Sequence, residues 1–505
     1  MAGLAFGLSL PSPALSNDSR LIGGQPATPS SMTLYVELVV NRLPTGRIVR
    51  TELRNGAYFI RVADLDGVSL PAGVTDGELV DLSRLPDVKT EYDSAAQKFL
   101  ITVPSVWLPA NQIETASARN RIAASVSPGM LINYDVYASA PSRGSSQLSV
   151  WTEGRLFDSW GTLVSTGVYR KSFGEKALAG PVRDGRYLRY DTSFTYTDFD
   201  RIITYEAGDL ITGALSWNTP VRLGGISVSR DFPSRPDIVT YPLPQFAGQA
   251  AVPTAVDLLI NGSKVATGEV APGPFVFNEL PFVNGAGEAT LVTTDALGRK
   301  VETSVPFYIA NNLLRPGLWD YSVSAGAIRQ GYGIRSFSYG DFALSGSARF
   351  GAAPFLTLEG HVEGARHLQL GGLGAGIRLG LNGVVNTSVA LSHTQGAIGR
   401  QYSVGYSYSS QRFSLSVRHM ERTADFRDLA SYDIRDVAAS SLMRSSTQAN
   451  TSVNLGRSAG TIGAAYFEMT TVDRNRNRGA NLSYMRGRPD AALMAGSMPQ
   501  CSKNA

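Results

Sequence analysis

Segments of roughly ten residues, in which apolar and polar residues alternate, recur along most of this 505-residue chain. In LINYDVYAS, Ile132, Tyr134 and Val136 share one face and polar residues share the other. Successive side chains of a β-strand point to opposite faces, so each segment predicts a strand with one apolar face. The series begins near Leu131, and about fourteen segments can be counted, in the pattern typical of strands that cross an outer membrane.

A soluble array of β-sandwiches is the alternative, because its strands also alternate. Two features favour the membrane barrel. The polar faces carry Asp, Glu, Arg and many Ser instead of a second core, and the apolar faces are rich in Tyr and Phe, as in the aromatic girdles of barrels. The sequence therefore predicts an all-β fold built on a transmembrane antiparallel β-barrel.

Composition argues against several classes of function. Lys and Arg number 46 against 42 Asp and Glu, without a polybasic block, so we expect no nucleic-acid partner. The only cysteine is Cys501 and there are four histidines, so we expect neither a metal site nor a cofactor. The glycine run at 371–383 lacks the GK[ST] of a nucleotide-binding loop, and no GxSxG occurs, so we expect no nucleotide and no enzyme.

The texture of the chain divides it into blocks. The start, MAGLAFGLSLPSPALS, is either a clipped secretory signal or an apolar leader, and a polar stretch follows it. Asn55-Gly56, between two β-like runs, predicts a hairpin in a compact first domain. The expected blocks are a signal remnant and disordered tail at 1–31, a β-rich domain at 32–110, first barrel strands at 130–247, an inserted domain at 248–308, further barrel strands at 309–486, and an aberrant tail at 487–505.

The block at 248–308 interrupts the barrel series. Short apolar strands joined by tight turns, including Asn261-Gly262, predict a β-sandwich. Such a domain inside a barrel sequence is expected either to plug the lumen or to lie at one mouth.

Several long strings resemble a known family. They are TAVDLLINGSKVATGEVAPGPFVFNELPFVNG in the insert, TYEAGDLITGALSWNTPVRLGGISVSRDFPSRPDIVTYPLP before it, NNLLRPGLWDYSVSAG after it, and LYVELVVNRLPTGRIV in the first domain. Over about residues 32–484 the chain resembles the outer-membrane ushers of the chaperone-usher pathway, which assemble fimbriae.

The resemblance implies a gated secretion pore and assembly platform without enzymatic activity. A usher has a barrel of roughly 24 strands with a plug after the sixth strand. Its N-terminal domain lies in the periplasm and recruits chaperone-bound pilin subunits, which polymerise by β-strand addition. The expected surroundings are therefore the periplasm, chaperone–pilin complexes and outer-membrane lipid.

The end of the chain departs from that pattern. After GANLSYMRG the alternation stops, and about fourteen strands fall short of the family number. We expect an incomplete barrel in a truncated, non-functional copy, with a smaller native barrel as the alternative. Open sheet edges in lipid would leave backbone amides unpaired.

Two groups of residues are candidates for the implied function, although each member has an ordinary structural explanation. An apolar pair in the polar tail and the exposed face of the first strand are candidate contacts for the chaperone–subunit complex: Leu21, Ile22, Tyr35 and Glu37. Charges expected to face the lumen or to lie on the plug, together with one tryptophan, are candidates for gating: Glu206, Asp209, Trp217, Arg222, Arg230, Glu279, Arg299 and Lys300.

Two rival functions remain at this point. One is a plugged porin or solute transporter, and the other is a barrel hydrolase with carboxylates and His on its loops. The separate first domain and the mid-barrel insert favour the secretion pore over both.

Overall fold

The computed structural model describes most of the chain between residues 31 and 503, as two compact units. One unit spans residues up to 110 with 249–252 and 271–274, and the other holds the rest. The described ranges are 31–41, 43–65, 68, 79–85, 87–104, 107–108, 111–114, 126–141, 146–173, 185–250, 254–278, 283–295, 298–432, 442–456, 459–488, 491–497 and 500–503. Within these ranges, no helix is long and apolar enough to cross a membrane.

The first unit contains a six-stranded sheet in the order β4-β3-β2-β1-β6-β5. Phe99 and Ile60 are fully buried in its core, against Leu38 of the first strand. Asn55 and Gly56 have positive φ angles of 50° and 85° in the turn between β2 and β3, which confirms the expected hairpin. Its elements are β1 (Ser31–Val40), β2 (Leu43–Arg54), β3 (Ala57–Arg61), η1 (Val62–Leu65), β4 (Leu79–Asp81), η2 (Leu82–Arg84), β5 (Lys89–Asp93) and β6 (Lys98–Thr102).

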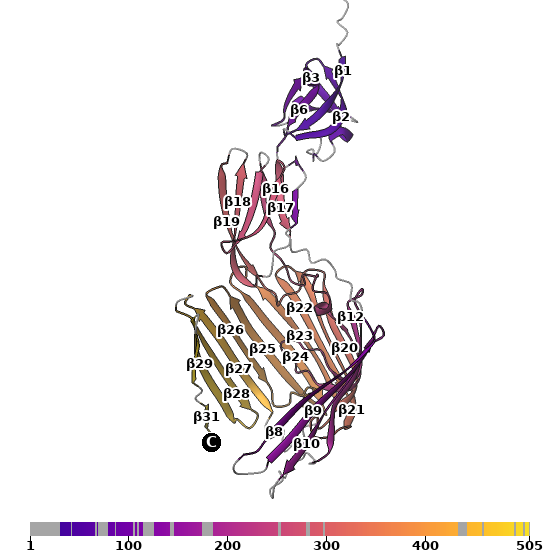
Figure 1. Ribbon diagram of the computed structural model, residues 1–505, viewed down its shortest axis with the longest axis vertical. Helices are drawn as coiled ribbons and strands as arrows, with labels where there is room; N and C mark the ends of the chain where they lie inside the picture. The colour runs from indigo at the N-terminus through magenta and orange to yellow at the C-terminus, as the bar shows by residue number, and fades with distance from the viewer. Residues whose placement is uncertain are drawn as a thin grey trace, which may run out of the picture. The chain divides into compact units, whose positions relative to one another are not determined.

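The second unit is dominated by a barrel, and Figure 1 shows its later strands following one another in chain order. Six strands precede the insert: β8 (Gly129–Ser139), β9 (Ser146–Asp158), β10 (Gly161–Phe173), β11 (Tyr187–Asp198), β12 (Ile203–Ile211) and β13 (Arg222–Arg230). The strands after the insert are β20 (Trp319–Arg329), β21 (Tyr339–Ala353), β22 (Leu356–Ala365), β23 (Leu368–Arg378), β24 (Val384–Thr394), β25 (Ala397–Ser409), β26 (Phe413–Arg422), β27 (Met443–Asn454), β28 (Thr461–Thr471), β29 (Arg476–Arg488), β30 (Ala491–Ser497) and β31 (Gln500–Lys503).

The strand order differs from the expected incomplete barrel. Within the described residues, sixteen strands, β8–β13 and β20–β29, are joined by β30 and β31, which both pair with β29, and the order closes at β8. The all-β barrel class is confirmed, but the strand count exceeds the expected fourteen and the described order has no open edge. Some strands alternate only weakly in sequence, such as β27, which has Thr447, Ala449 and Thr451 on one face.

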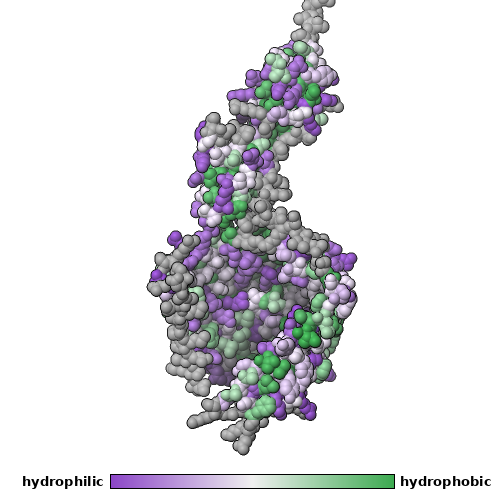
Figure 2. Space-filling view, viewed as in Figure 1, coloured by the Kyte–Doolittle hydropathy of each residue, from purple (hydrophilic) through white to green (hydrophobic). Residues whose placement is uncertain are grey.

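The outer wall of the barrel is apolar. Ile226, Leu344, Val362 and Leu373 are all more than half exposed and share one face, as expected of side chains that meet lipid. Figure 2 shows hydrophobic residues gathered on the strands that Figure 1 labels β8 to β10. On these strands, the apolar face of the alternation is the outer face of the barrel.

The insert between β13 and β20 has two sheets. A four-stranded sheet has the order β16-β15-β18-β19, and Asn261-Gly262 forms the expected turn with φ angles of 51° and 80°. A three-stranded sheet has the order β14-β17-β7, in which β7, from before the barrel, runs parallel to β17. The strands are β7 (Asn111–Glu114), β14 (Phe246–Ala250), β15 (Thr254–Ile260), β16 (Ser263–Val270), β17 (Gly273–Asn278), β18 (Gly285–Asp295) and β19 (Lys300–Ile309), and η4 (Phe232–Ser234) lies in the connection from β13.

We expect Phe99→Ala to lower the free energy of unfolding of a 1–110 fragment by about 3–5 kcal/mol, because Phe99 fills the centre of a core with no second sheet to compensate. Urea unfolding followed by circular dichroism measures the change. The control Tyr35→Ala removes a side chain that is 67% exposed and should shift stability by no more than about 0.5 kcal/mol. Equal effects of the two substitutions would contradict the assignment of this core.

Candidate functional site: the barrel lumen

Two connections between barrel strands fold back onto the inner wall. Residues 212–221 join β12 to β13, and residues 423–432 follow β26. Leu429 packs in one cluster with Leu210 of β12 and Leu368 of β23, which are separated by four strands in the barrel order. The cluster lies on the face opposite the exposed outer residues such as Ile226 and Leu344, so this face is the lumen. The two connections are called the lumen segments below.

Trp217 anchors the first lumen segment. Its side chain is 2% exposed, and its Nε1 donates to Oε2 of Glu359 at 2.8 Å. Its carbonyl accepts a hydrogen bond from Nε2 of Gln401 at 2.8 Å. The indole lies on Gly372 and Gly374, where an added Cβ would come within 2.7 and 2.8 Å of the ring. Two glycines of the run in β23, Gly372 and Gly374, are therefore required by this packing, whereas Gly371 has open space around it.

A buried His–Glu pair joins the two lumen segments. Nε2 of His361 lies 2.9 Å from Oε1 of Glu363, and both side chains are almost fully buried. The other oxygen of Glu363 accepts the backbone N–H of Leu429 at 2.7 Å. The His361 ring meets Trp217 edge-on with centroids 5.8 Å apart. One strand, β22, thus holds both segments.

The second lumen segment has further polar anchors. Arg422 pairs with Asp428 at 3.2 Å, and the hydroxyl of Tyr432 donates to Asp341 at 2.7 Å. Phe426 packs with Trp217 in a buried cluster. The segment is therefore held by a few polar bonds and a small apolar contact, an arrangement that a competing partner can replace more easily than a large apolar interface.

The predicted gating charges do not share one face. In the unbroken ladder of β12 with β13, Glu206 pairs with Ser227 on the same side as Leu210, which is the lumen side. Asp209, Arg222 and Arg230 fall on the opposite side, so the expectation that they face the lumen is wrong. Residues 206 and 209 are three positions apart in one strand, so their side chains point to opposite faces of the barrel wall. The polarity of the two residues does not reveal this difference.

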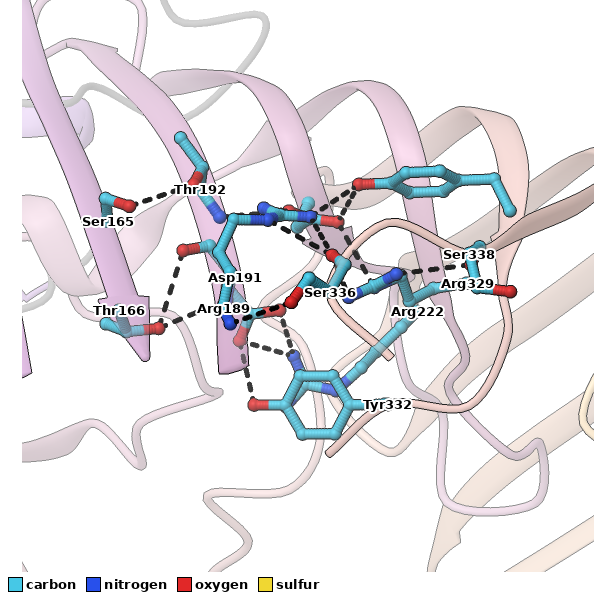
Figure 3. Close-up of polar contacts among 12 residues, drawn as sticks. Ser165, Thr166, Arg189, Asp191, Thr192, Arg222, Arg329, Tyr332, Ser336 and Ser338 are labelled. Carbon is cyan, nitrogen blue, oxygen red and sulfur yellow. Dashed lines mark hydrogen bonds and ion pairs between the residues drawn. The ribbon is translucent and has the colours of Figure 1, made fainter. Parts of the chain in front are cut away.

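Asp209 and Arg222 belong instead to a group on the outer wall, which Figure 3 shows. Asp209 accepts a hydrogen bond from the hydroxyl of Tyr339 at 2.7 Å and pairs with Arg189. This outer-wall cluster consists of Arg189, Asp191, Asp209, Arg222, Arg329, Tyr332, Ser336 and Tyr339.

Contacts between the insert and the barrel lie at the strand ends nearest the insert, termed the insert end. Tyr308 stacks on Tyr408 with centroids 5.9 Å apart, and its carbonyl accepts from Nη1 of Arg378 at 3.1 Å. Burial raises the pKa of Tyr308, although a backbone hydrogen bond at Ser409 opposes the shift. A single bridge joins Ala286 to Ser410.

The remaining candidates are dispersed. Arg299 and Lys300 lie at the β18–β19 hairpin, opposite the sheet end that touches the barrel. Arg230 donates to the carbonyl of Arg201 at 3.2 Å, at the insert end of β13. Glu279 lies outside the described residues.

On the first domain, Tyr35 and Glu37 lie on the exposed face of β1, and Glu37 pairs with Lys98 at 3.5 Å. Leu21 and Ile22 lie outside the described residues. Across the described ranges, no group of three metal-ligating side chains occurs.

Comparisons with known proteins agree with this architecture. Residues 208–488 match a family model described as "Outer membrane usher protein". The chain is 23% identical over 404 residues to the outer membrane usher protein AfaC of Escherichia coli, covering 76% of this chain and 44% of that protein. It is 28% identical over 176 residues to the F1 capsule-anchoring protein of Yersinia pestis, covering 35% of this chain and 21% of that protein.

A cryo-EM structure of the E. coli P pilus tip assembly intermediate PapC-PapD-PapK-PapG shares the fold, with a TM-score of 0.56, 18% identity and coverage of 93% of this chain and 62% of that one. The chain spans between about a fifth and under half of the length of the curated relatives it matches. The family is one of outer-membrane transport pores and not of enzymes. Because the family model covers more than half of its residues, the chain belongs to the outer membrane usher proteins.

Proposed function

We propose that the chain forms a gated translocation pore for pilin subunits that periplasmic chaperones deliver, rather than the non-functional copy expected from its sequence, because its described strand order closes. The observation that carries this proposal is the insert: it is joined to the wall between the sixth and seventh barrel strands, and it touches that wall through few contacts, at Tyr308 and Ala286. A domain attached in this way can be displaced without disturbing the barrel.

The inner wall suits the passage of a protein. Hydroxyl pairs recur on neighbouring strands, with Oγ atoms 2.6 Å apart in Ser388 and Ser403 and 2.7 Å apart in Ser414 and Ser452. Paired hydroxyls leave few unsatisfied groups, and they present little apolar surface to which an incomplete pilin sheet could adhere.

The gate in this proposal has two parts. The lumen segments narrow the pore from the wall, and the insert acts as a plug in the closed state. Glu206 on the lumen face and Arg299 and Lys300 at the tip of the insert supply opposite charges that can hold such a plug. With Glu279 they form the proposed polar contacts that a bound chaperone–subunit complex replaces.

We propose that the first domain recruits the complex through Tyr35 and Glu37, with Leu21 and Ile22 of the preceding segment as a second contact. An exposed tyrosine beside a charged residue is a frequent anchor in protein interfaces. Its own buried core lets this sheet bind without help from the barrel.

We expect Trp217→Ala to raise the ionic conductance of the pore in planar bilayers. The change removes the hydrogen bond to Glu359, which keeps its ion pair with Arg349. It also empties the space that the buried ring fills on Gly372 and Gly374, at a cost of about 3–5 kcal/mol. The first lumen segment is thereby loosened. Trp217→Phe, which keeps the ring but loses the donor, should give an intermediate conductance. The control Trp319→Ala removes an outward tryptophan stacked on Phe350 and should leave conductance unchanged. Unaltered conductance in Trp217→Ala would show that the lumen segment does not restrict the pore.

Replacing residues 254–309 with a short Gly-Ser linker should open the pore further, because the proposed plug is lost. Conductance of the deletion variant in planar bilayers measures the effect, and migration of unheated samples in gels verifies that the barrel is folded. A folded deletion variant with the conductance of the intact chain would place the insert at a mouth of the pore instead of in its lumen.

The recruitment proposal is tested by calorimetry of a 1–110 fragment with a chaperone–subunit complex. The double substitution Tyr35→Ala and Glu37→Ala, and separately the loss of residues 1–30, should each weaken binding by about 1–2 kcal/mol or more. Arg84→Ala, whose side chain is 81% exposed elsewhere on the domain, is the control and should bind as the unchanged fragment does. A folded unchanged fragment that shows no binding at about 10 μM would reject the recruitment role.

A further inference from the structure

The connection between β20 and β21, residues 330–338, is bonded to the outer wall of the barrel. The backbone N–H of Arg189, on β11, donates to Oγ of Ser336 at 3.2 Å, and Nη2 of the same arginine donates to the carbonyl of Ser336 at 2.9 Å. In the barrel order β11 is separated from β20 by β12 and β13. The loop therefore crosses two strands on the outside of the wall.

The outer position follows from strand register. Asp209 pairs with Gly224, on the side opposite the lumen residues Leu210 and Leu223. The ring of Tyr339 covers Gly224, where an added Cβ would lie 2.3 Å from Cε1 of that ring. The hydroxyl of Tyr339 reaches Asp209, so the outer-wall cluster and its loop lie on the lipid side.

The loop covers a short ladder in the wall. The ladder of β11 with β12 runs from Ser193 and Gly208 to the insert end, whereas β12 pairs with β13 along its whole length. Beyond that point, Oδ2 of Asp209 accepts a hydrogen bond from the backbone N–H of Thr192 at 2.9 Å. Oγ of Ser336 accepts a hydrogen bond from the backbone N–H of Arg189. Side chains thus replace the missing ladder bonds (Figure 3).

Two buried arginines satisfy the carbonyls of the loop. Arg329, 7% exposed, donates to the carbonyls of Arg335 at 2.9 Å, Ser336 at 2.7 Å and Ser338 at 3.2 Å. Asp209, with its side chain 3% exposed, balances Arg189 and Arg329. Irregular backbone is tolerated at membrane depth only where its polar groups are bonded internally, and the clamp bonds the carbonyls of Arg335, Ser336 and Ser338 in this way, although Nε of Arg329 itself has no hydrogen-bond partner.

Three exposed side chains of the loop are apolar, and Arg335 beside them is exposed as well, a charge suited to the headgroup level. Phe337 is 75% exposed, Ile334 41% and Tyr332 36%. Phe337 covers the guanidinium of Arg189, with Cζ 4.2 Å from the ring centroid. Strand β21, which follows the loop, carries Phe342 on its outer face, 62% exposed. The loop therefore continues the apolar surface of the barrel instead of interrupting it.

We propose that residues 330–338 form a membrane anchor that rests on the outer wall and inserts Phe337 at the boundary between lipid headgroups and hydrocarbon. The partner is the lipid of the outer membrane, because this surface is continuous with the lipid-facing wall of a protein placed in that membrane. Aromatic side chains concentrate at this depth in membrane proteins. The buried charges of the outer-wall cluster hold the loop against the wall at this depth.

Spin labelling of the full chain in liposomes tests the proposal. With Cys501→Ser as background, single labels are placed by Phe337→Cys, by Phe342→Cys on the lipid-facing wall, and by Gln395→Cys at an exposed hairpin at the same end of the barrel. Power saturation then compares access of oxygen, which enriches in lipid, with access of a water-soluble nickel chelate. We expect the label at 337 to behave as that at 342 does, with high oxygen and low nickel access.

Two outcomes overturn the anchor. High nickel access, equal to that at 395, would place the loop in water, and low access of both reagents would mean that a protein surface covers it.

A second variant tests the clamp. Arg329→Gln should release the loop, so that the label at 337 loses its preference for oxygen while the label at 342 keeps its own. Unchanged access at 337 in a folded Arg329→Gln variant would contradict the role of the clamp. If that variant does not fold, Tyr332→Ala provides the weaker form of the same test, because it removes the bond to Asp191 and the contacts with Arg222 and Tyr190 but leaves Arg329 in place.

Discussion

Closure of the backbone ladder is the constraint on which the rest of the structure depends, because lipid offers no partner to an unpaired N–H or carbonyl group. Strands of alternating polarity satisfy this requirement while giving the barrel an apolar outside and a polar inside. Where the ladder between β11 and β12 stops at Ser193 and Gly208, the carboxylate of Asp209 and the hydroxyl of Ser336 take over. The loop that supplies Ser336 then needs its own clamp, which explains the buried arginines on an otherwise apolar wall.

The same alternation lines the lumen with short polar residues. These residues leave space in which segments of the chain itself can pack. Chain segments fold onto that inner face because it offers a few well-placed partners, such as Glu359 and Gln401 for Trp217 and Glu363 for Leu429. These contacts are mostly single hydrogen bonds. A narrowing built in this way closes the pore at modest cost and leaves the wall intact when it opens.

The periodicity of the sequence predicted those parts of the fold that depend on local sequence, such as strands with one apolar face. It identified the barrel, the hairpin at Asn55-Gly56 and the turn at Asn261-Gly262, since each depends on local sequence. It could not show that β7 pairs with β17, because a parallel pairing between distant segments leaves no local pattern. Periodicity is also a weak guide to β27, whose two faces differ little in polarity.

The candidate site was less accessible to sequence. Trp217 stood out as an aromatic residue in a short connection, but its partners Gly372 and Gly374 lie far along the chain. Asp209 and Arg222 were misplaced because charge was taken to mean lumen, whereas a covering loop lets charges face outward. Counting positions from Leu210 would have revealed their face once the lumen side was known.

The central claim is that a closed pore opens when a chaperone–subunit complex binds. Single-channel recording of the full chain in planar bilayers, before and after a purified complex is added from the side of the N-terminal domain, tests it most directly. The account predicts a low basal conductance that rises on addition of the complex and stays low with the chaperone alone. A conductance that is high from the start, or one that the complex leaves unchanged, would contradict it.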